Sequence, residues 1–125
     1  MTRLVLFISL FLVAACSKTE TVELPNGYKI WAMNPKEIYL SNAANELVVG
    51  FAIANVGVDG DLVVVECVDA TPATSPNGYL NQKGYSLVNT SSGSIETGLT
   101  LPDVERRALE VGFDLAALKP VSDYF

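Results

Sequence analysis

The chain has 125 residues, with 14 acidic and 8 basic side chains, a formal net charge of −6 at pH 7 and no histidine. The acidic balance disfavours nucleic acid as a partner, because phosphate neutralisation needs clustered cations and the longest basic cluster is Arg106-Arg107. The lack of histidine excludes Ser-His-Asp and Cys-His catalysis and histidine-containing zinc sites, which leaves a carboxylate mechanism as the remaining catalytic class.

The N-terminal segment has the pattern of a removable targeting sequence. Residues 4–15 (LVLFISLFLVAA) follow Arg3 and carry no charge. A membrane-spanning helix needs about 20 apolar residues, so this shorter run is typical of a signal peptide. We therefore exclude residues 1–15 from the folded domain.

The apolar segment ends in Val13-Ala14-Ala15-Cys16, where a cysteine lies at the boundary with polar sequence. This pattern resembles the lipobox of bacterial lipoproteins, in which an aliphatic and two small residues precede a cysteine. The resemblance implies cleavage between Ala15 and Cys16, a diacylglyceryl group on the Cys16 sulfur and an acyl chain on its new α-amine. Two or three acyl chains make dissociation from a membrane negligible. The alternative is an ordinary secretory signal beside a chance cysteine.

The residue after the cysteine is Ser17. In lipoproteins of Gram-negative bacteria, the absence of Asp at this position is associated with export to the outer membrane, so the resemblance implies an outer-membrane lipoprotein facing the periplasm. We expect residues 16–24 to form a lipid-anchored tether and residues 25–125 to form a single β-rich domain, since about 110 residues suit one domain.

From residue 25 onward the sequence predicts strands and turns. Asp59-Gly60 separates two apolar runs, which predicts a hairpin with a type I′ turn, in which both central residues have positive φ. The unbroken run at residues 62–65 (LVVV) indicates that both faces of the sheet are covered there. A turn is predicted at residues 25–27, and strands at residues 28–33, 37–40, 47–54, 62–68, 84–89 and 94–97.

The period then changes to that of a helix. Apolar residues three, four and three apart predict one helical face: Leu101, Val104, Ala108 and Val111. Thr100 is the expected N-cap, with Asp103 as its reciprocal partner, and Gly112 is the expected stop. A short turn is expected at residues 115–118. The predicted fold is mainly β, of the α+β class: an antiparallel β-meander sheet with one C-terminal helix.

The segment 83–99 (KGYSLVNTSSGSIETGL), followed by this helix, resembles the closing hairpin of small bacterial envelope lipoproteins of unassigned function. Those proteins carry a Gly-Tyr strand, an Asn/Asp-Thr turn, a short strand and Gly-Leu. The resemblance supports a meander with a terminal helix. Some proteins of this general kind are immunity proteins against secreted toxins, although no residue here carries that activity.

Two further features have structural and chemical interpretations. If Cys16 carries lipid, Cys67 has no partner cysteine in the chain, and we expect its thiol to fill the core, the alternatives being an intermolecular disulfide or a reactive thiol. Residues 55–66 (NVGVDGDLVVVE) fit the frame of an EF-hand calcium loop, with Gly60 at the turn and Glu66 at the last position. Gly57 offers no oxygen at the third position and the flanks resemble strands, so we expect a plain hairpin and no metal or other cofactor.

The loop at residues 69–82 is rich in turn formers, and Tyr79 in it is expected to be exposed and is the candidate partner-binding residue. Trp31 is expected in the core.

No catalytic, cofactor or metal residue is assigned. We expect a non-catalytic protein-binding lipoprotein, of the inhibitor, immunity or accessory kind. The alternatives are a carboxylate-dependent hydrolase of cell-wall glycans and a passive structural lipoprotein. Paired carboxylates in a cleft would favour the hydrolase, and an exposed aromatic or apolar patch would favour the binder.

Overall fold

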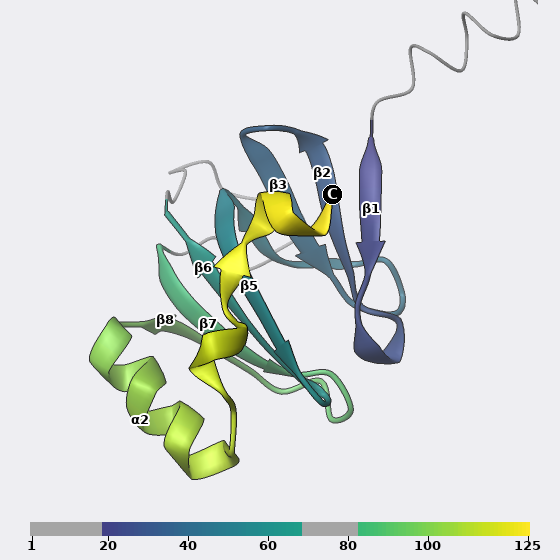
Figure 1. The fold of residues 1–125 in the computed structure, drawn as a ribbon. Coiled ribbons are helices and arrows are strands. Elements are labelled where there is room, and N and C mark those ends of the chain that lie inside the picture. Colours follow the sequence, from purple (N-terminus) through teal and green to yellow (C-terminus); the bar gives the residue numbers. More distant parts are fainter. Residues whose placement is uncertain (1–18, 69–82) are drawn as a thin grey trace, which may run out of the picture.

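The computed structural model describes residues 19–68 and 83–125, which form two antiparallel sheets with one α-helix on the second sheet (Figure 1). The first sheet has the order β1-β2-β3-β4, and the second has the order β8-β7-β6-β5-β9. The predicted α+β class, mainly β with a C-terminal helix, is confirmed. The strands of the first sheet are β1 (Glu20–Glu23), β2 (Lys29–Asn34), β3 (Glu37–Ser41) and β4 (Leu47–Phe51). Those of the second are β5 (Ile53–Asp59), β6 (Leu62–Cys67), β7 (Gly84–Asn89), β8 (Ile95–Leu99) and β9 (Lys119–Pro120).

The chain passes from the first sheet to the second at Ala52, inside the run that the sequence predicts as one strand at residues 47–54. β4 ends at Phe51 and β5 begins at Ile53. The meander therefore forms two layers instead of one sheet. The apolar pattern is continuous across this bend because both halves bury side chains in the same core, Val49 from β4 and Ile53 from β5.

The first strand, β1, lies in the segment that we expected to be a tether. Glu20 pairs with Ala32 and Glu23 with Lys29, so residues 20–23 form the edge of the first sheet. One inward residue, Val22, packs on the core. A single apolar side chain between charged ones gives little sequence signal, and charged side chains are common on edge strands. The expected tether is wrong for residues 20–23.

The β5–β6 hairpin confirms the predicted pairing but not the predicted turn. Asp59 pairs with Leu62, so the two central residues are Gly60 and Asp61. Gly60 has a φ of 60°, and Asp61 is not among the described residues with positive φ. Positive φ at the first central residue alone is typical of a type II′ turn, which has glycine at that position.

Both faces of the second sheet are covered, as the run at residues 62–65 predicts. Val63 and Val65 are fully buried in the core between the two sheets, whereas Val64 is fully buried under the helix. Successive strand residues point to opposite faces, so each layer receives alternate valines. Cys67 is buried in the core between the sheets, as expected.

The helix α2 (Leu101–Val111) packs on β7 and β8. Its predicted capping box is present, because Thr100 accepts a hydrogen bond from the Asp103 backbone and Asp103 accepts one from the Thr100 backbone. Gly112 ends it with a φ of 76°. Val104 and Ala108 are buried, but the predicted apolar face is wrong for Leu101 and Val111, at the two ends of the helix, which remain exposed.

Three short 3-10 helices complete the fold: η1 (Pro25–Gly27), η2 (Leu115–Ala117) and η3 (Val121–Tyr124). η1 and η2 confirm the turns predicted at residues 25–27 and 115–118. In the described part of the chain, no helix combines the length and the hydropathy needed to cross a bilayer.

Candidate functional site

Three residues assigned from the sequence lie outside the described residues. These are Ala15 and Cys16 at the signal cleavage site and Tyr79 in the loop at residues 69–82. Their roles as cleavage site, lipidation site and partner-binding residue stay predictions.

The residues that fit the EF-hand frame form the β5–β6 hairpin. The Asn55 amide donates a hydrogen bond of 2.7 Å to the Glu66 carboxylate across the two strands. The first and last residues of the EF-hand frame, Asn55 and Glu66, are therefore hydrogen-bonded to each other. Within residues 19–68 and 83–125, no three acidic or cysteine side chains are grouped so that they could hold a metal ion.

Cys67 does not have the surroundings of a reactive thiol. Burial raises the pKa of its thiol to about 11, and the nearby Glu66 carboxylate contributes to the same shift. A nucleophilic cysteine needs the opposite shift, because the thiolate is the reactive form. The structure therefore supports core filling.

Two acidic side chains come together at α2, but a cation lies between them. The Arg107 guanidinium donates to the Glu96 carboxylate of β8 at 2.8 and 2.9 Å and also contacts Glu110. The hydrogen bond from Arg107 lowers the pKa of Glu110. A general acid in glycoside hydrolysis needs a raised pKa. This cluster instead holds the helix against the sheet.

The outer face of the first sheet carries a row of side chains across all four strands. Thr21, Trp31, Tyr39 and Gly50 are successive cross-strand partners. Their neighbours along the chain, such as Ile30 and Leu40, fill the core, so by alternation the row lies on the opposite face. Trp31 and Tyr39 are half-buried. Among the described helices, α2 packs on the second sheet and leaves this face uncovered.

Neighbouring side chains fix the two rings of this row. The Trp31 indole N–H donates to the Ser41 hydroxyl at 2.7 Å, and the Lys29 ammonium lies 5.9 Å from the Trp31 ring centroid. Tyr39 lies directly over Gly50, where an added Cβ would come within 2.5 Å of the Tyr39 Cδ1. We call Lys29, Trp31, Tyr39, Ser41 and Gly50 the aromatic face. The sequence expectation that Trp31 lies in the core is wrong, because the alternation of β2 buries Ile30 instead.

A pocket of about 670 Å³ opens at one end of the first sheet, where β1 begins and β2 turns into β3. This volume lies within the range of ligand pockets, which is about 300 to 1,000 Å³. Met33 and Phe125 are exposed at 39% and 43% and form its apolar rim. Its lining residues are Glu20, Ala32, Met33, Asn34, Pro35, Ile38, Val121, Ser122 and Phe125, of which Glu20 alone is charged.

The C-terminal segment forms the far wall of this pocket. The Tyr124 hydroxyl donates to the Val56 carbonyl oxygen of β5 at 2.9 Å, and Val121 is buried, so η3 is fixed across the end of the core. On the near side, the Asn34 side chain accepts hydrogen bonds from the backbone of Lys36 and Glu37 and holds the β2–β3 turn. Sequence reasoning missed this pocket because its walls are about 85 residues apart in the chain and meet only through tertiary packing.

Comparison of the chain with protein-family models, with curated proteins and with solved structures finds no match. The geometry of the aromatic face and of the pocket therefore provides the basis for a functional interpretation.

Proposed function

We propose that the protein is a lipid-anchored lipoprotein of the bacterial cell envelope that binds another envelope protein without catalysing a reaction. The lipid is attached at Cys16, and the domain faces the periplasm from the outer membrane. The aromatic face is its recognition surface. The observation that carries this proposal is the row on which the half-buried Trp31 and Tyr39 lie side by side on adjacent strands, a face that no helix of the described residues covers.

Three properties of the aromatic face favour binding. Trp and Tyr dominate interface hot spots because they bury a large area at a low cost in side-chain entropy. The Ser41 hydroxyl and the close contact with Gly50 already hold both rings in place, so little freedom is lost on binding. The charged side chains of Lys29 and Glu37 lie beside the rings and supply the polar rim that such interfaces have.

The proposed partner carries a basic surface. The chain has a net charge of −6, which would steer a cationic surface toward it and raise the rate of association. Tyr79 is proposed as a second contact.

A binding role accounts for the site better than the hydrolase alternative. A glycosidase places two carboxyl groups on opposite sides of one bond. Glu20 has the one acidic side chain among the described lining residues of the pocket, and the other lining side chains are neutral. The carboxylates of Glu96 and Glu110 both contact the Arg107 cation.

Affinity capture tests the proposal. The full lipidated protein, reconstituted in neutral vesicles, is used to retain proteins from an envelope extract, and each retained protein is identified and its Kd measured. Tyr39→Ala should weaken binding of the true partner by about tenfold or more, the effect of losing a hot-spot side chain. Tyr79→Ala should also weaken it.

Leu109→Ala provides the matched control, because Leu109 is 86% exposed on α2, away from the aromatic face. The control should bind like the wild type, and all three variants should keep the wild-type thermal transition. A retained protein whose affinity is the same for Tyr39→Ala and the wild type would contradict the proposed recognition surface.

A further inference from the structure

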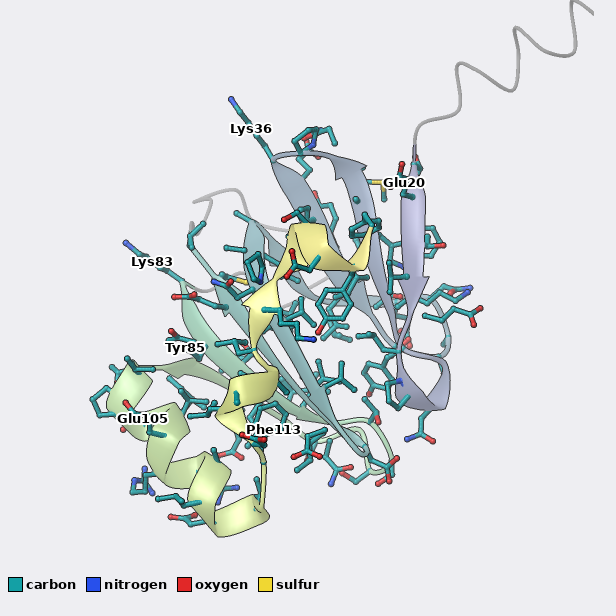
Figure 2. All side chains as sticks on the ribbon, viewed as in Figure 1. Glu20, Lys36, Lys83, Tyr85, Glu105 and Phe113 are labelled. Carbon is teal, nitrogen blue, oxygen red and sulfur yellow. The ribbon has the colours of Figure 1, made fainter. Side chains whose placement is uncertain are left out.

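The pocket lies at the end of the domain from which the chain leads back to the lipid anchor. Glu20, the first residue of β1, is one of its lining residues. In Figure 1, β1 begins at the same end of the first sheet as the β2–β3 turn and the C-terminus. Figure 2 shows Glu20 and Lys36 at this end, and Glu105 and Phe113 at the other side of the molecule.

Chain length limits how far this end can be from the membrane. Glu20 is four residues after Cys16, and a fully extended chain spans at most about 14 Å over four residue steps. If Cys16 carries acyl chains embedded in the bilayer, the pocket entrance cannot be further from the headgroup region than that. This step rests on the lipid anchor of the proposed function.

The two ends of the first sheet differ in chemistry. At the end away from Cys16, the Asn26 amide donates to the Asp61 carboxylate at 3.1 Å and to the Thr90 hydroxyl at 2.9 Å, which closes the space between the sheets with polar groups. The end near Cys16 has no such pair of side-chain hydrogen bonds in the described residues and is spanned by η3. It presents the exposed apolar side chains Met33 and Phe125 around the pocket instead.

We propose that this end of the domain docks on the bilayer surface, with Met33 and Phe125 inserted at the boundary between headgroups and acyl chains. Exposed apolar side chains gain free energy on entering that boundary. The anchor already holds the domain at the membrane, so docking does not bear the full translational cost of association. The Lys36 ammonium, at the tip of the β2–β3 turn, reaches the phosphate level while its methylene chain remains in apolar surroundings.

Apolar contact, and not charge, drives this docking. Among the described residues, the charged side chains that line the pocket or adjoin its lining residues in sequence are Glu20, Lys36, Glu37 and Asp123, an acidic majority. Anionic lipids should therefore weaken docking, and neutral lipids should support it. Docking also orients the molecule, because the strands of the first sheet run toward the membrane and the aromatic face then points sideways, where a neighbouring envelope protein can reach it.

Trp31 is the only tryptophan of the chain and lies two residues from Met33 on β2, about 7 Å away along the strand, so its fluorescence reports on docking. The lipidated protein is reconstituted in phosphatidylcholine vesicles, with and without phosphatidylcholine brominated near the headgroup end of its acyl chains. The wild type should be quenched by the bromine. Met33→Asp should shift the docked-to-undocked ratio by about tenfold toward the undocked state and lose most of the quenching. Phe125→Ser should act in the same direction.

Leu109→Asp is the control, since it adds a carboxylate to an exposed apolar position on α2, which is 86% exposed against 39% for Met33. It should be quenched like the wild type. Intact mass reports acylation of Cys16 in the same samples, so the two proposals can be distinguished. Acylated protein without quenching, or with equal quenching in Met33→Asp and wild type, overturns docking alone. A protein whose intact mass lacks the acyl groups overturns both the lipid anchor and the docking proposal. If the pocket instead takes an apolar segment of a partner protein, vesicles give no quenching, and the docking proposal is overturned.

Discussion

At the residue scale, single backbone and side-chain positions fix the hairpin at the centre of the second sheet. Gly60 has a φ of 60°, which side-chain-bearing residues rarely adopt, and a Cβ built there meets no atom within 4 Å. Position 60 therefore requires glycine because of its backbone conformation, and not because a neighbouring atom would clash with a side chain. The same residue is the reason why a hairpin was predictable from Asp59-Gly60, although the register moves the glycine to the first central position of the turn.

Replacing this glycine tests the conformational account. Gly60→Val should destabilise the domain by more than about 1 kcal/mol, because a β-branched residue resists positive φ, and should lower Tm by several degrees. Gly60→Asn is the control and should cost less, since Asn tolerates positive φ better than other residues with a side chain. Thermal unfolding followed by circular dichroism measures both. Equal Tm values for Gly60→Val and the wild type would mean that the turn does not hold Gly60 in this conformation.

At the scale of elements, α2 is held to the second sheet by two kinds of contact: the buried pair Val104 and Ala108, and the Arg107 bridge to Glu96. The ion pair between Arg107 and Glu110, both on α2, makes part of the stability of the fold depend on pH. Arg107 lowers the pKa of Glu110 below the ordinary value of 4.5. A carboxyl group with a lowered pKa in the folded state stabilises the fold above its ordinary pKa, and this contribution is lost as the pH falls through the folded-state value.

Removing the cation should therefore cost stability at neutral pH and cost little in acid. We expect Arg107→Met, which keeps most of the aliphatic side chain, to unfold at lower denaturant concentration than the wild type at pH 7. The difference should shrink as the pH falls below the folded-state pKa of Glu110. Arg106→Met is the matched control with a smaller effect, because Arg106 is 62% exposed and its pair with Glu110 is more strongly screened. A difference of the same size at neutral and acidic pH would contradict the role of this ion pair.

Elements with local signals were predictable, and elements formed by distant contacts were not. The hairpin, the cap at Thr100 and the stop at Gly112 depend on residues adjacent in sequence, and the structure has all three. β1 depends on pairing with β2, and a segment with Val22 as its one inward residue gives no periodic pattern. Strand alternation at residues 28–33 predicts two faces but does not say which is covered, so the half-buried position of Trp31 on the outer face could not be read from the sequence. The position of η3 against β5 likewise follows from tertiary contacts.

At the scale of the whole molecule, three chemically distinct features lie on different parts of the two sheets. One end is closed by polar hydrogen bonds, the other end carries the apolar pocket near the proposed anchor, and the outer face of the first sheet presents Trp31 and Tyr39. The proposed anchor gives this arrangement its orientation, because it determines which end meets the bilayer. Both the recognition face and the docking surface are interpreted relative to Cys16.

Metabolic labelling with a radioactive fatty acid tests this anchor most directly. Cells expressing the full chain or its Cys16→Ser variant are labelled, and incorporation into the protein and its distribution between membrane and soluble fractions are measured. The wild type should incorporate label and remain with the outer-membrane fraction, whereas Cys16→Ser should incorporate none and accumulate as an uncleaved or mislocalised precursor. Equal labelling of the two proteins, or a wild type that carries no label, would contradict the lipid anchor on which the account depends.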